Sequence, residues 1–69
     1  MERISVKSRI ITAMNYDEQQ RRLQIFFRNG QARMFADVPR DIVAEFAQSP
    51  SPGHFYLERV REQYQLLAA

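Results

Sequence analysis

The sequence predicts an α+β fold, in which a three-stranded antiparallel meander sheet is followed by two helices packed on one face. Three observations indicate this fold: apolar and polar residues alternate through residues 23–39 except at Phe26, an Asn-Gly pair lies within that stretch, and apolar residues recur at helical spacing after Pro39. With 69 residues, the chain suits one small domain spanning residues 1–69.

The three expected strands are separated by clear turn signals. Residues 8–16 are rich in β-branched and apolar types and run into the polar cluster 15–20, which is typical of a strand that ends in a turn. Residues 22–28 form the second expected strand. Asn29-Gly30 follows it, and both residues tolerate the positive φ of a type I′ turn, so a third strand is expected at residues 31–37.

A two-residue loop at Asn29-Gly30 sets the register of the expected hairpin and sorts its side chains into two faces. The face to be buried carries only apolar side chains: Leu23, Ile25, Phe27, Ala32, Met34 and Ala36. The opposite face, called the outer face below, carries Gln24, Phe26, Arg28, Gln31, Arg33 and Phe35.

The first helix is expected over residues 39–48. Pro39 pre-sets the φ angle of a first helical turn, and apolar residues recur after it at Ile42, Val43 and Phe46. This helix should cover the apolar sheet face, which makes three side chains candidates for the deepest burial: Ile25, Phe27 and Phe46.

The second helix is expected to begin after the segment SPSPG at residues 49–53, with Ser51 as its N-cap and Pro52 in its first turn. Its apolar stripe consists of Phe55 or Tyr56, Val60, Tyr64 and Leu67. Residues 66–69 are expected to fray.

The residue types argue against an enzyme or a metal site. The chain has no cysteine, and His54 is its only histidine, so neither a thiolate site nor a paired histidine site can form. Ser51 is better explained as a helix cap than as a nucleophile, and Asp17, Asp37 and Asp41 as turn and helix-start residues. We therefore expect no catalytic activity and no cofactor.

No segment is apolar enough to cross a membrane or to act as a signal peptide, because the strictly apolar runs, such as residues 25–27, are at most four residues long. A cytoplasmic location without a membrane partner is expected. The net charge of +2 is too small to indicate a nucleic-acid ligand by itself. Nine of the ten basic residues are arginine, which grips phosphate and stacks on flat groups, although a G+C-rich genome would produce the same bias.

The outer face is the predicted ligand-binding surface, because Phe26 and Phe35 share it with Arg28 and Arg33. Such a face could stack the bases of single-stranded RNA or tRNA while the arginines hold phosphates. A protein interface is the alternative: a partner protein, a second copy of the chain, or the N-terminal residues 4–6 could cover the same aromatic side chains.

The order of these elements resembles the KTSC domain, a small family named for a C-terminal extension of certain lysyl-tRNA synthetases and also found as stand-alone bacterial proteins. The resemblance covers nearly the whole chain and rests on Ser8, Ile11, Tyr16-Asp17, Leu23-x-Ile25-x-Phe27-x-x-Gly30, Asp37-Val38-Pro39, Ser51-x-Gly53-x-Phe55-Tyr56, Val60 and Tyr64. It implies no established activity, and RNA binding is suggested largely by the synthetase context.

Two positions depart from the family pattern. The family's central Tyr-x-Tyr falls on Arg33-Met34-Phe35, so arginine replaces the first aromatic residue. Leu57 stands where the family usually has asparagine.

Overall fold

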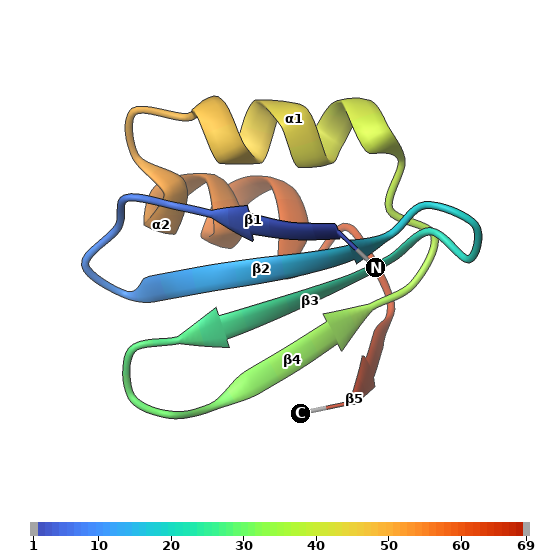
Figure 1. The fold of residues 1–69 in the computed structure, drawn as a ribbon, viewed down its shortest axis with the longest axis horizontal. Helices are drawn as coiled ribbons and strands as arrows, with labels where there is room; N and C mark the ends of the chain where they lie inside the picture. Colours follow the sequence, from blue (N-terminus) through green and yellow to red (C-terminus); the bar gives the residue numbers. More distant parts are fainter. Residues whose placement is uncertain (1, 69) are drawn as a thin grey trace.

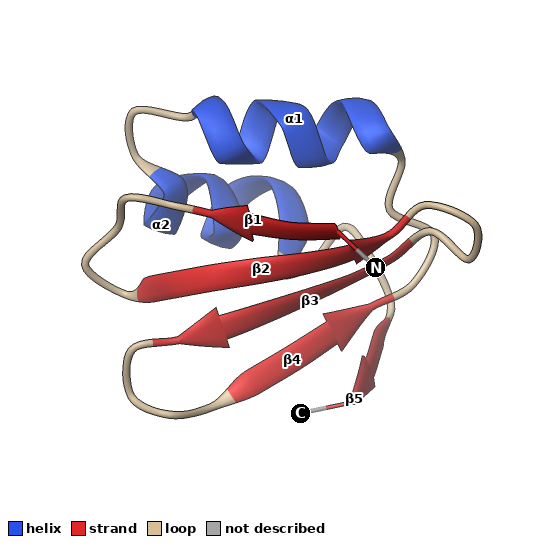
Figure 2. Cartoon of the chain, viewed as in Figure 1, coloured by secondary structure: helices blue, strands red, loops and turns tan. Residues whose placement is uncertain are grey.

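The computed structural model describes residues 2–68 and shows one antiparallel sheet with the helices packed on one of its faces (Figures 1 and 2). The strand order is β1-β2-β3-β4-β5. In chain order, the elements are β1 (Glu2–Ser5), β2 (Ile11–Asp17), β3 (Arg22–Phe27), β4 (Ala32–Phe35), α1 (Arg40–Gln48), α2 (Pro52–Phe55), the π-helical turn η1 (Tyr56–Val60) and β5 (Leu66–Ala68). The α+β class and the placement of both helices on one face are confirmed.

The sheet has five strands, so the prediction of a three-stranded sheet was wrong. The additional strands are the two edges: β1 pairs with β2, and β5 pairs with β4. β1 has four residues and β5 has three, which is too short to show a period-two pattern in the sequence. Each is held extended by pairing with the unpaired backbone groups of the strand beside it. Residues 66–68 therefore form a strand where fraying was expected, and Ala69 lies outside the described residues.

The β3–β4 hairpin has a three-residue loop, where a two-residue loop was predicted. The amide of Phe27 donates to the carbonyl of Gln31 at 2.8 Å, and Gly30, at φ 93°, donates back to the Phe27 carbonyl at 3.0 Å. A left-handed glycine at the third loop position is typical of such hairpins. The longer loop shifts the register by one residue, so that Leu23 lies opposite Phe35 and Ile25 lies opposite Arg33.

This shift turns β4 over, because neighbouring residues in a strand point to opposite faces. Arg33 and Phe35 lie on the helix side of the sheet, whereas Ala32 and Met34 lie on the outer face with Phe26. The predicted face assignment was correct for β3 and wrong for β4.

The core lies between the sheet and the helices. Its buried side chains are Ile11, Met14, Tyr16, Leu23, Ile25, Phe35, Val38, Val43, Phe46, Tyr56 and Val60. Ile25 and Phe46 are fully buried, as expected, but Phe27 is only partly buried because it lies near the end of the sheet. Ile4 lies opposite Met14 and packs against the core, so the N-terminal strand does not cover the outer face.

The second helical segment is shorter than expected. It ends at Val60, and in its last turn the amide of Arg61 donates to the carbonyl of Tyr56 at 2.8 Å, five residues earlier. Ser51 precedes α2, but its side chain makes no capping hydrogen bond. Single π-helical turns often occur at functional sites, and this one begins with Tyr56.

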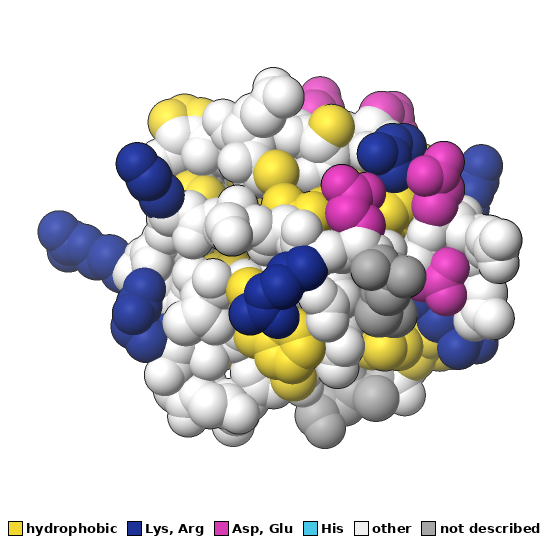
Figure 3. Space-filling model, in the orientation of Figure 1, with side chains coloured by type: hydrophobic (Ala, Val, Ile, Leu, Met, Phe, Trp, Pro, Cys, Tyr) yellow, Lys and Arg dark blue, Asp and Glu magenta, His cyan; other side chains and the backbone are white. Residues whose placement is uncertain are grey.

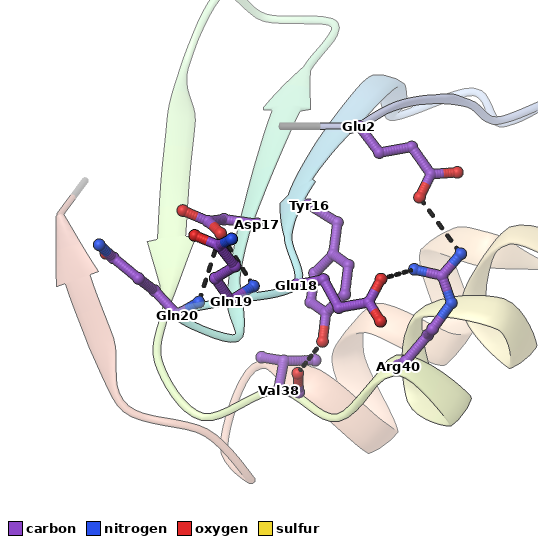
Figure 4. A network of polar contacts seen from close by, with 8 residues as sticks. All are labelled: Glu2, Tyr16, Asp17, Glu18, Gln19, Gln20, Val38 and Arg40. Atoms are coloured by element: carbon purple, nitrogen blue, oxygen red, sulfur yellow. Dashed lines mark hydrogen bonds and ion pairs between the residues drawn. The ribbon is translucent and has the colours of Figure 1, made fainter.

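A buried hydroxyl ties β2 to the segment before α1 (Figure 4). The hydroxyl of Tyr16 donates to the carbonyl of Val38 at 2.7 Å, so both buried polar groups are satisfied. Burial raises the pKa of Tyr16, and the charge of Arg21 acts in the opposite direction.

Surface polar contacts lie around the turn that follows β2 (Figure 4). A carboxylate oxygen of Asp17 accepts the backbone N–H groups of Gln19 and Gln20, which confirms its role as a turn residue. Arg40 forms ion pairs with Glu18 at 2.7 Å and Glu2 at 3.4 Å. These side chains are more than half exposed, so each pair adds little to stability.

Candidate ligand-binding site

The four residues predicted to form one surface are divided among different parts of the molecule. Phe26 lies on the outer face, with the guanidinium of Arg3 over its ring at 6.0 Å. Phe35 is 1% exposed and belongs to the core, so no ligand can stack on its ring in this structure. The stacking platform of Phe26 and Phe35 does not exist, because the three-residue loop places the two rings on opposite faces of the sheet.

Arg28 and Arg33 are brought together, but beside a pocket and not on the outer face. The pocket has a volume of about 390 Å³ and lies between the segment preceding β2, the β3–β4 loop and the start of η1. We call it the hairpin pocket; its lining residues are Arg9, Ile10, Phe27, Arg28, Asn29, Gln31, Arg33 and Tyr56.

An aromatic corner and one arginine form the inner wall of the hairpin pocket. The rings of Phe27 and Tyr56 meet edge to face, with centroids 5.1 Å apart. The guanidinium of Arg33 lies over the Phe27 ring at 5.8 Å and donates from Nη1 to the Tyr56 hydroxyl at 2.9 Å. These contacts hold the charge of Arg33 against a flat apolar surface while leaving it partly exposed.

Arg28 holds the rim of the pocket in place. Its Nε donates to the carbonyl of Arg9 at 3.0 Å, and its Nη2 donates to the carbonyl of Ser8 at 2.9 Å. Its backbone N–H extends the β2–β3 pairing by donating to the carbonyl of Ile10 at 2.8 Å. Arg28 is therefore a positioning residue that fixes the segment preceding β2.

That segment is folded by Ser8, whose Oγ accepts the backbone N–H groups of Ile10 at 3.2 Å and Ile11 at 3.3 Å. The turn leaves the side chain of Ile10 on the surface, 43% exposed, at the mouth of the pocket. Sequence reasoning missed Arg9 and Ile10 because it placed both in a strand, whereas β2 begins only at Ile11.

The pocket is electrostatically positive. Three of its lining residues are arginine and none is acidic. Within residues 2–68, Arg9 and Arg33 form no ion pair. Figure 3 shows basic side chains at the end of the molecule where the β1–β2 and β3–β4 loops lie in Figure 1, while the acidic side chains in that view lie on its upper and right parts.

The pocket can therefore offer an anion two charged donors beside an aromatic surface. Tyr56 is a further residue that sequence reasoning did not assign to a site, since its spacing with Val60 indicated only a core stripe. Its ring is 3% exposed and does belong to the core, but its hydroxyl reaches Arg33 at the pocket wall. No helix in the described part of the chain is long and apolar enough to span a membrane.

Comparison with known proteins identifies the family. The model of the KTSC domain matches residues 7–64, which is most of the chain. The chain belongs to the KTSC domain family. The crystal structure of a KTSC domain protein from Yersinia pestis is similar over 99% of this chain and 96% of that chain, with a TM-score of 0.89 and 25% sequence identity. No curated protein matched the sequence.

The hairpin pocket contains a position at which this KTSC domain departs from the family pattern. Of the two residues to which the resemblance assigned the central motif, Phe35 packs in the core against Tyr56, with ring centroids 6.0 Å apart. The other, Arg33, lines the pocket. Arg33 adds a positive charge to the wall of the pocket.

Proposed function

We propose that this KTSC domain is a non-catalytic binding module that holds single-stranded RNA, including the unpaired nucleotides of a tRNA, in the hairpin pocket. The observation that carries the proposal is the position of Arg33, which is fixed by Phe27 and Tyr56 at the wall of a pocket that Arg9 and Arg28 also line. Unpaired bases are recognised by stacking on aromatic and guanidinium planes, and their phosphates by arginine.

The chemistry of the pocket favours a nucleotide over a purely apolar ligand. The exposed faces of Ile10 and Phe27 suit a base, and the unengaged nitrogens of Arg9 and Arg33 suit a phosphate. A duplex suits the pocket less well, because its bases are already stacked and their faces are covered.

Titration of fluorescently labelled single-stranded RNA, followed by anisotropy at two salt concentrations, tests the proposal. We expect Arg33→Gln to weaken binding by about tenfold and to reduce the dependence of affinity on salt, because one phosphate contact is lost. Arg61→Gln is the matched control: it removes the same charge from an exposed residue that does not line the pocket, and it should change affinity far less. Equal effects of the two variants would show that RNA is attracted only by overall charge.

Protein contact through the outer face is the second candidate function. Phe26, Ala32 and Met34 are only half-buried there, and both helices lie on the other face (Figure 2). If this face forms a dimer, sedimentation at several concentrations should detect self-association that Phe26→Ala abolishes. A chain that is monomeric at every concentration would exclude the dimer.

A further inference from the structure

A second hollow adjoins the hairpin pocket. Its volume is about 470 Å³, and it lies between the segment preceding β2 and the start of α2. We call it the α2 hollow; its lining residues are Lys7, Ser8, Arg9, Ile10, Pro50, Ser51, Pro52 and Gly53. Arg9 and Ile10 line both cavities, so these two residues form the ridge between them.

The ridge is packed in place by a close approach between two segments. A Cβ atom at Gly53 would lie 2.9 Å from Cδ1 of Ile10, so the end of the Ile10 side chain packs against α2 where Gly53 has no side chain. The Ser8 turn and the hydrogen bonds of Arg28 hold the same segment from the other side. The hydrogen bonds of Ser8 and Arg28 therefore fix the backbone of the segment that separates the two cavities.

The two cavities differ in chemistry. The hairpin pocket has an aromatic wall, whereas the α2 hollow has none and carries Lys7, Arg9 and two serine side chains. An ammonium group binds phosphate as a point charge, and serine hydroxyls are suitable partners for a ribose hydroxyl. Neither cavity is lined by an acidic residue.

We infer that the α2 hollow is the subsite for the ribose-phosphate of the next nucleotide, so that this KTSC domain binds two consecutive nucleotides with their bridging phosphate at Arg9. The inference rests on the proposed function, since it extends the same RNA site across the Arg9–Ile10 ridge. The base of the first nucleotide occupies the hairpin pocket, and the second base remains in solvent.

The test compares uridine monophosphate with a uridine dinucleotide that carries the same terminal phosphate, each titrated into isotopically labelled protein and followed by NMR. We expect the dinucleotide to bind about tenfold more tightly, because it adds one phosphate contact. The amides of residues 51 and 53 should shift with the dinucleotide and remain unchanged with the monophosphate. The amides around Arg33 should shift with both.

Two variants separate the subsites. Lys7→Gln should weaken dinucleotide binding and leave monophosphate binding unchanged, whereas Arg33→Gln should weaken both. Ser51→Trp, which places a large side chain in the α2 hollow at an exposed position, should remove the advantage of the dinucleotide. Each variant is checked for folding by its amide spectrum, and Arg61→Gln again controls for the loss of one charge.

Equal affinities for the two ligands, or no shift at residues 51 and 53, would overturn the second subsite while leaving RNA binding at the hairpin pocket intact. If neither ligand nor a longer single-stranded RNA binds, both the subsite and the proposed function are wrong.

Discussion

Tyr16 shows how one side chain joins two parts of the fold. Its ring lies in the core, and its hydroxyl satisfies the carbonyl of Val38, which precedes α1. The sequence places Tyr16 at the end of an expected strand, at residues 8–16. Its hydroxyl is buried, because the β4–α1 connection folds back over it (Figure 4).

The variant Tyr16→Phe should lower the free energy of unfolding by about 1–3 kcal/mol at neutral pH, because the buried carbonyl of Val38 loses its donor. Thermal or urea unfolding measures this cost. Tyr64→Phe is the control, since Tyr64 is half-buried and its hydroxyl makes no hydrogen bond to the described residues; it should cost less.

The same variant should change the pH dependence of stability. Because the pKa of Tyr16 is raised in the folded chain, the unfolded chain ionises first, near the ordinary value of 10.0. The contribution of this group is fully present below that pH and is lost as the pH rises beyond it. Above this pH, the free energy of unfolding should therefore fall less steeply with rising pH for Tyr16→Phe than for the parent chain. Equal slopes for the two chains would contradict the prediction.

At the scale of elements, the hairpin loop decides what β4 presents to each side. One additional loop residue places Phe35 in the core and Arg33 in the hairpin pocket. The sequence of β4 does not forbid either register, because Ala32 and Met34 are as apolar as the core requires. What favours the observed register is the better filling of the core by the large ring of Phe35, which meets Tyr56 from η1.

The register predicts an order of stability for two phenylalanine variants. Phe35→Ala should cost about 3–5 kcal/mol, because the ring is fully buried, and Phe27→Ala should cost distinctly less, because that ring is partly exposed at the pocket. Chemical unfolding of both variants gives the comparison. If Phe35→Ala fails to fold while Phe27→Ala remains folded, the expected order holds. The reverse order would contradict the observed register and support the two-residue loop.

At the scale of the whole molecule, the two edge strands complete a sheet whose three central strands lie within the residues matched by the KTSC model. The KTSC model matches residues 7–64, so β1 and β5 lie outside it, although the similar structure covers 99% of the chain. β5 returns beside β4 after the last helical turn (Figure 1), and the amide of Ala36 donates to the carbonyl of Gln65 at 2.9 Å.

Ending the chain after Tyr64 should lower the free energy of unfolding by roughly 1–2 kcal/mol, because β4 loses the edge strand in which Leu66 lies opposite Phe35. Amide hydrogen exchange should become faster in β4 and remain unchanged in β1, which pairs at the opposite edge of the sheet. Unchanged exchange in β4 would show that β5 contributes nothing to the sheet.

The sequence by itself determined the α+β class, the three central strands, the positions at which both helices begin and the burial of Ile25 and Phe46. These features depend on local patterns: alternation with period two, helical spacing, proline positions and the Asn29-Gly30 turn signal. It also placed Arg28 and Arg33 close together on the hairpin, and both line the hairpin pocket.

Only the tertiary structure decided the hairpin register, the two edge strands and the site itself. A shift of one residue in a hairpin leaves the local pattern almost unchanged but exchanges the two faces, and packing against the helices selects between them. Short edge strands form only because a neighbour offers unpaired backbone groups. The hairpin pocket joins Arg9, Arg33 and Tyr56 from three distant segments, and no spacing along the chain records that they meet.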